Sequence, residues 1–180
     1  MKMLSRPILA AFALATLAHP LGAESPHFGI QGLANAPLGD LKDFVDDKPG
    51  LGAGIHGTFD LGLGNMLRPR LDYNDFPEAT LSGIKNGATC LGLGVDYLYF
   101  VAGKPEGFYL TGGVAVNRWS FSTEAPGTAK ATHTTTKPGL ALGAGIQWTE
   151  AFGTEARFIT TRISQDFSAE SIQIGATLRF

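Results

Sequence analysis

The side chains best suited to acid–base chemistry in this chain are one histidine and two carboxylates. His56 could act as a general base that is oriented by Asp60 or by Asp96. The pattern places no serine or cysteine nucleophile beside His56, however. The simpler interpretation is that His56 is one of several polar side chains that fill an interior, so we predict a protein without enzymatic activity.

Charged residues recur at every second position in several segments of the chain. Arg68, Arg70 and Asp72, for example, are separated from one another by single uncharged residues. Successive side chains of a β-strand point to opposite faces, so these charges share one face of a predicted strand. We predict that such faces meet in a polar network inside a barrel lumen. Its predicted members are His56, Asp60, Arg68, Arg70, Asp72, Asp96, Glu155, Arg157 and Arg179.

Three other patterns have a structural explanation that is simpler than a binding site. Residues 52–57 fit the dinucleotide pattern GxGxxG, but they lie inside a predicted strand and open no helix. We expect these glycines, like those at 92, 94, 143 and 145, to make room for bulky neighbours in a small lumen. The acidic segment 40–47 lacks the spacing and glycine of a calcium loop. We therefore predict no cofactor and no metal site.

Two further residues are interpreted in the same way. Cys90 is the only cysteine, so it cannot form an internal disulfide, and the alternation places it on an inward face. His133 lies among threonines, in a segment that we expect to be a mobile polar loop tip.

Eight segments alternate apolar and polar residues over roughly ten positions, the length that a tilted membrane strand requires. Pro69 falls within the third segment and has no N–H to donate, so we expect a bulge or weak pairing there. The predicted strands are residues 27–35, 51–61, 67–74, 89–99, 108–118, 139–148, 154–163 and 171–180.

The segments that connect these strands alternate in length. Residues 62–66, 101–107 and 149–153 are short, whereas 36–50, 75–88 and 119–138 are longer, and 164–169 is the shortest of the second set. Short turns on one rim and long loops on the other are typical of outer-membrane barrels. This arrangement predicts periplasmic termini and loops outside the cell.

The apolar faces carry no charge until Arg118 and Arg162, near the outer ends of their strands. A charge that faces lipid in mid-bilayer costs about 2–4 kcal/mol for Arg or Lys, so this placement favours a membrane barrel. Aromatic residues near the strand ends are typical of interfacial girdles. These are Tyr73, Tyr97, Tyr99, Phe100, Phe108 and Trp148.

The N-terminus has the features of a secretory signal peptide. Lys2 and Arg6 precede an apolar run, and Leu21-Gly22-Ala23 offers a small-residue cleavage site. We predict a signal peptide at residues 1–23 and a barrel domain at 24–180. Removal of Lys2 and Arg6 changes the formal charge from −2 to −4, which leaves no electrostatic basis for binding nucleic acid.

The last strand, residues 171–180, alternates apolar and polar side chains and ends on Phe180. The chain resembles the small eight-stranded outer-membrane barrels of the OmpA, OmpX and opacity-protein type. The resemblance rests on this last strand, the signal peptide, the strand pattern and residues 155–158 (Glu-Ala-Arg-Phe). The resemblance implies an all-β, eight-stranded antiparallel up-and-down transmembrane barrel. It also implies that Phe180 is an assembly signal read by the outer-membrane assembly machinery, and that outer-membrane lipid surrounds the barrel.

The function predicted from these features is structural, adhesive or otherwise based on surface contacts through extracellular loops. Three alternatives stay open. The first is a narrow channel for small or hydrophobic solutes, because periodicity does not show whether the lumen is filled. The second is a soluble periplasmic lipocalin-like carrier, in which the same alternation is turned inside out. The third is a lipid-modifying enzyme, although the apolar faces offer no Ser, His and acid set.

Overall fold

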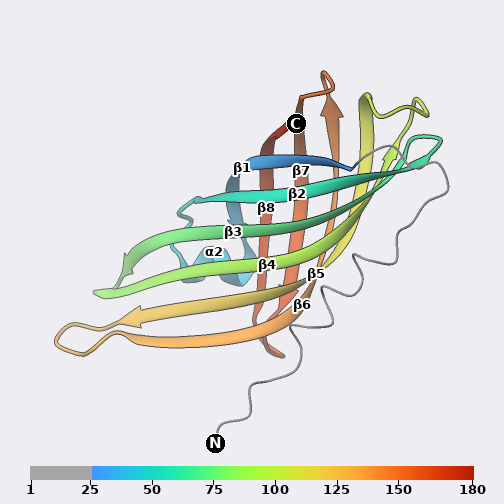
Figure 1. Cartoon of the computed structure of the whole chain (residues 1–180). Coiled ribbons are helices and arrows are strands. Elements are labelled where there is room, and N and C mark those ends of the chain that lie inside the picture. The colour runs from blue at the N-terminus through green and yellow to red at the C-terminus, as the bar shows by residue number, and fades with distance from the viewer. Residues whose placement is uncertain (1–25) are drawn as a thin grey trace, which may run out of the picture.

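Alternating side chains give every strand one apolar and one polar face, and closing the sheet buries the polar one. The computed structural model describes residues 26–180. Eight antiparallel strands form a closed barrel in which each pairs with the next and β8 pairs with β1 (Figure 1). They are β1 (His27–Leu38), β2 (Gly50–Gly62), β3 (Asn65–Leu81), β4 (Ile84–Phe100), β5 (Gly107–Glu124), β6 (Ala131–Gln147), β7 (Phe152–Arg162) and β8 (Ser168–Arg179). The predicted all-β up-and-down barrel is confirmed, and the predicted signal peptide lies outside the described residues.

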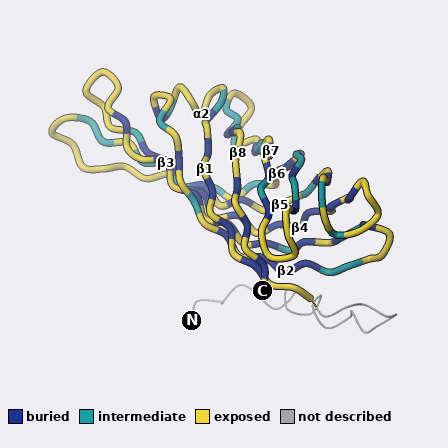
Figure 2. Tube along the Cα trace, turned by 90° about the horizontal axis from the view of Figure 1, so that it is seen from above, coloured by how far each residue is buried: buried dark blue, intermediate teal, exposed yellow. Residues whose placement is uncertain are grey.

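Buried and exposed residues alternate along the strands, and this is visible around the barrel in Figure 2. In β8, Ile172, Ile174 and Leu178 are exposed on the outside, whereas Gln173 and Thr177 are buried in the lumen. The wall therefore presents its apolar face outward. A lipocalin-like carrier would need an apolar interior, so the structure contradicts that alternative.

Strands β3 to β6 are longer than the others. They contain 17, 17, 18 and 17 residues, whereas β1, β2, β7 and β8 contain 12, 13, 11 and 12. Their outer ends project beyond the barrel as paired hairpins (Figure 1). The loops predicted at 75–88 and 119–138 are thus mostly strand, and His133 pairs with Phe121 instead of lying at a loop tip.

The turn between β3 and β4 shows why these segments remain paired to their ends. Leu81 pairs with Ile84, which leaves only Ser82 and Gly83 in the turn, both at positive φ (51° and 84°). Two positive φ values define the type I′ turn, whose twist matches that of paired strands. The sequence Ser-Gly was not recognised as this signal because the surrounding residues lack strict alternation.

Pro69 interrupts pairing on one side of β3 only. It pairs with Val95 of β4, but on the other side the β2–β3 register passes from His56↔Arg70 to Phe59↔Leu67 without pairs between. The missing N–H of proline accounts for this gap. The predicted weak pairing at Pro69 is confirmed, whereas the register shift in this strand pair lies further on, between Asp60 and Gly62.

The segment between β1 and β2 contains the short helix α2 (Gly39–Phe44), which packs against β8 and β1 at the outer mouth. Within residues 26–180, the chain forms no helix that is long and apolar enough to span a bilayer.

Candidate functional site

The centre of the lumen contains three arginines around one carboxylate. Asp96 Oδ2 accepts hydrogen bonds from Arg68 Nη2 (2.8 Å), Arg70 Nε (2.9 Å) and Arg157 Nη1 (3.0 Å). Asp72 pairs with Arg70 and lies 3.6 Å from Arg157 Nη2. All five side chains are buried, so each charge depends on its partners for the stabilisation that water would otherwise give.

A third carboxylate completes this network from the opposite wall. Glu155 of β7 binds Arg68 of β3 at 2.8 Å and Arg157 of its own strand at 3.1 Å. Gln31 donates to Glu155 Oε1 (3.0 Å), and the Tyr109 hydroxyl donates to Oε2 (3.0 Å). Three arginines thus meet three carboxylates, and the buried network is formally neutral.

Amide side chains form a layer on the extracellular side of the charges. Gln173 donates to Asn35 (2.9 Å) and to Asn74 (3.1 Å), and Arg157 donates to Gln173. Asn117 donates to Thr161 (2.8 Å). The sequence interpretation omitted these residues because it followed charge alone, although the same alternation places them on the inward faces.

Three predicted members of the network form none of its ion pairs. Asp60 is half-buried at the end of β2 and accepts a hydrogen bond from the Gly62 amide (2.6 Å), because the strand leaves its regular register there. His56 and Arg179 are buried, but neither forms a salt bridge within the described chain, and His56 Nε2 has no hydrogen-bond partner there. The proposed pairing of His56 with Asp60 or Asp96 is therefore absent from the described hydrogen bonds.

Inward-facing glycines create the space for this network. A Cβ atom at Gly113 would collide with the Asp96 carboxylate, and one at Gly143 would lie 2.8 Å from Cγ of Arg157. A Cβ at Gly145 would strike the Tyr109 ring. The expectation that strand glycines make room for bulky neighbours is thus confirmed at Gly143 and Gly145 but not at Gly57, where a Cβ would have its nearest contact at 3.7 Å.

The periplasmic end of the lumen is closed by apolar side chains. Met66, Leu98, Phe100 and Tyr109 form a buried cluster, in which the Phe100 and Tyr109 rings lie 4.9 Å apart. Phe100 was predicted to belong to an interfacial girdle, which is wrong. It is fully buried because the alternation of β4 turns it inward, next to the exposed Tyr99.

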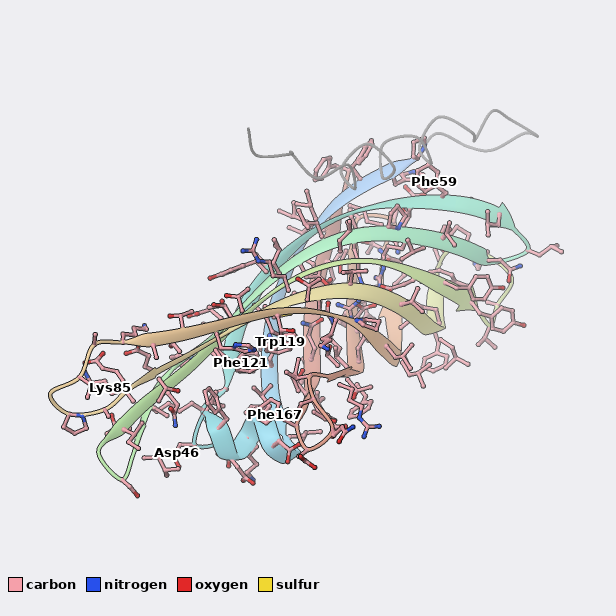
Figure 3. The ribbon with its side chains drawn as sticks, turned by 90° about the horizontal axis from the view of Figure 1, so that it is seen from below. Asp46, Phe59, Lys85, Trp119, Phe121 and Phe167 are labelled. Atoms are coloured by element: carbon pink, nitrogen blue, oxygen red, sulfur yellow. The ribbon has the colours of Figure 1, made fainter. Side chains whose placement is uncertain are left out.

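An aromatic cap closes the extracellular end (Figure 3). Leu41 and Val45, from α2 and the residue after it, are fully buried against the ends of the strands. Trp119 stacks on Phe121 with centroids 5.6 Å apart, and Phe121 meets the edge of Phe167. We call this group the aromatic cap. Its members are Leu41, Phe44, Val45, Phe76, Ala88, Cys90, Trp119, Phe121, Ile163, Phe167 and Ala169.

The free space between the charges and the aromatic cap is small. A cavity of about 20 Å³ lies there, among Arg70, Asn74, Cys90 and Asn117. A volume of this size holds one or two water molecules. Eight-stranded barrels have interiors just wide enough to be filled by side chains, so this geometry opposes the channel alternative.

The projecting hairpins form a four-stranded sheet with two open edges. Pairing of β3 with β2 ends at Asp75, and pairing of β6 with β7 ends at Gly139. The edge residues 76–81 and 131–138 therefore have no neighbouring strand among the described residues on their outer sides. We call this part of the molecule, residues 76–88 and 119–138, the extracellular sheet. Within residues 26–180, no group of three or more His, Cys, Asp or Glu side chains is arranged to hold a metal ion.

Residues 8–180 match the family model of the outer membrane protein beta-barrel domain, and the chain belongs to this family. It is therefore an outer-membrane β-barrel. No curated protein sequence matches the chain significantly.

Solved structures show the same fold at low sequence identity. The N-terminal β-barrel domain of Pseudomonas aeruginosa OprF is 13% identical, with a TM-score of 0.61, over 88% of this chain and 99% of that one. Ail, the attachment invasion locus protein of Yersinia pestis, is 12% identical with a TM-score of 0.62, over 86% and 97%. Neisserial surface protein A is 13% identical with a TM-score of 0.61, over 89% and 100%.

Proposed function

We propose that this chain is a non-enzymatic outer-membrane protein that contacts an extracellular partner through the extracellular sheet. The observation that carries the proposal is the pairing of β3 to β6 to their tips, which gives an ordered surface in place of flexible loops. The two open edges add unpaired backbone groups of the kind that bind an extended segment of another protein. One similar structure, Ail, is by its name an attachment protein.

The filled lumen supports the same function. The ionic network and the aromatic cap hold the strand ends in fixed positions, so the extracellular sheet rises from a rigid base. The cavity between the charges and the aromatic cap holds only one or two waters, and among the described residues the outward faces of the strands carry no Ser, His and acid set. Outer-membrane lipid and the assembly machinery, acting on Phe180, are the other partners that we propose. Phe180 is exposed, and its backbone pairs with Phe28.

Shortening one hairpin tests the proposal. Ser122 pairs with Thr132, so residues 123–131 can be replaced by Asn-Gly, which forms a two-residue turn. The aromatic cap stays intact because Phe121 is retained. We expect a normal heat-dependent gel shift, which reports a folded barrel, and reduced attachment of expressing cells to host cells or matrix.

A matched control replaces the periplasmic turn residues 102–106 by Asn-Gly, which should leave attachment unchanged. Equal attachment by the wild type, the shortened hairpin and cells without the protein would overturn the proposed function.

A further inference from the structure

Two arginines stand on the lipid-facing side of the wall at its extracellular rim. Arg118 of β5 is exposed on the same face as Val114 and Val116, and Arg162 of β7 on the same face as Phe158. Arg118 pairs with Thr136 of β6, and Arg162 lies one residue beyond the last β6–β7 pair, Gly139↔Thr161. Only β6 separates the two arginines.

Strand geometry places the two side chains within reach of one ligand. The two arginines are two interstrand spacings apart across β6 and are offset by two residues along the strands. Their Cα atoms are therefore roughly 12 Å apart. Each arginine side chain extends about half that distance, so the two guanidinium groups can approach the same head group. Thr136, the exposed residue of β6 that pairs with Arg118, places a hydroxyl group between them.

Neither guanidinium has an acidic partner in the described structure. Arg162 is oriented by two backbone carbonyls, those of Ser164 (3.3 Å) and Gln165 (3.2 Å), which leaves three of its five N–H groups free. Acidic residues near this rim include Asp75 on β3, Glu170 on β8 and Asp166, which is exposed in the turn between β7 and β8. Glu170 accepts a hydrogen bond from Thr160, and none of the three carboxylates forms a salt bridge with Arg118 or Arg162 in the described structure.

We propose that Arg118 and Arg162 bind the phosphorylated head group of an outer-leaflet glycolipid. The arginines continue the apolar face that contacts lipid tails, so the group that lies beside them is the head group of the same lipids. The planar guanidinium matches phosphate in a bidentate geometry. The cost of a lipid-facing arginine is also much smaller near the interface, where this pair lies, than in mid-bilayer.

The test measures the binding of lipid A to the detergent-purified, signal-free chain by native mass spectrometry. The probes are diphosphoryl lipid A, lipid A without phosphate, and inorganic phosphate as a competitor. We expect R118Q/R162Q to bind diphosphoryl lipid A roughly tenfold more weakly than the wild type, which is the effect of losing one or two charge-assisted contacts. Binding of lipid A without phosphate should not change, and R118K/R162K should bind with intermediate affinity.

The matched control is K85Q/K104Q, which removes the same charge from the hairpin tip and the periplasmic turn. It should bind like the wild type. Equal binding by the wild type and R118Q/R162Q, or equal weakening in K85Q/K104Q, would overturn the proposal. Displacement of lipid A by an equal concentration of inorganic phosphate would also overturn it, because it would show a site for the anion alone. The heat-dependent gel shift verifies folding, and R118Q and R162Q singly provide the test if the double variant does not fold.

Discussion

Arg68 and Glu155 join opposite walls of the barrel through a 2.8 Å ion pair, although β3 and β7 share no hydrogen-bonded edge. The pair crosses the lumen and is buried at both ends. We call this Arg68–Glu155 ion pair the strut, because it fixes the distance between two opposite walls of the barrel, which strand pairing alone does not. It also makes the lumen sensitive to the loss of a single charge.

Replacement of Glu155 by Gln should strongly destabilise the barrel. Among the described residues, the change leaves Arg68 with Asp96 as its only acidic partner, and breaking a buried pair costs about 3–5 kcal/mol. We expect a loss of that order in the free energy of unfolding, measured by urea titration of the protein in detergent micelles. The double variant Arg68→Met/Glu155→Leu removes both charges and should lose less than Glu155→Gln alone. A loss below about 1 kcal/mol in Glu155→Gln would contradict a structural role for the strut.

Electrical recordings should show no steady conductance for the wild-type barrel in planar bilayers. The periplasmic cluster and the aromatic cap close the two ends of the lumen, and the cavity between the charges and the aromatic cap holds only one or two waters. Removing the strut with Arg68→Ala/Glu155→Ala opens space in the centre and should increase the frequency of brief current steps. A stable open level in the wild type would restore the channel interpretation.

The helix α2 should control access to Cys90. This thiol is buried in the aromatic cap, together with Leu41 of α2. Leu41→Asp places a charge where the side chain is fully buried, so it should release α2 while the barrel stays folded. Because Cys90 is the only cysteine, modification by a maleimide reports this release directly. We expect slow modification in the wild type and at least tenfold faster modification in Leu41→Asp, with Leu63→Asp in the periplasmic turn as the unaffected control.

The ion pair between Glu78 and Lys130 links the two hairpins and should break in acid. Lys130 Nζ lies 2.5 Å from Glu78 Oε1, and this ammonium lowers the pKa of the Glu78 carboxyl. A lowered pKa means that the contact is intact at neutral pH and is lost only as the pH falls below the ordinary range of glutamate, about 4.3. Spin labels at Thr80 and Thr128 should therefore show a broader distance distribution at pH 3 than at pH 7. In Glu78→Gln the distribution should be broad at both values, and a distribution in the wild type that does not change with pH would exclude this role.

The sequence was sufficient to predict the barrel because the alternation rule applies to each strand separately. Ile172, Ile174 and Leu178 could be assigned to the outer face without knowing which strand lies beside β8. The lumen contacts could not be predicted in this way. Whether Arg68 meets Glu155 depends on the stagger of strands that are far apart in the chain, and a single sequence does not contain that information. Asp60 shows the resulting error, since its position fits the alternation but lies beyond the network, where the register of β2 and β3 shifts.

The extracellular sheet was missed for a different physical reason. Outside the membrane, both faces of a strand meet water, so the alternation that identifies strands disappears. Residues 131–137 (Ala-Thr-His-Thr-Thr-Thr-Lys) contain little apolar contrast and were interpreted as a loop, although β-branched threonine is common in strands. The remaining indication of a hairpin in the sequence was the pair of turn residues Ser82-Gly83, and this pair alone was too weak a signal for a β-turn to be predicted.

The amide layer has a consequence for how the barrel closes during folding. Gln31 and Asn35 belong to β1 and Gln173 to β8, and their partners Glu155 and Asn74 come from β7 and β3. The first and last strands of the chain thus share one hydrogen-bond network across the seam where they meet. A barrel with that seam still open would expose arginines and carboxylates to hydrocarbon, so half-closed intermediates are high in free energy. Pairing of β8 with β1 and pairing of the buried charges therefore occur in one cooperative step. That step completes the folding of the barrel.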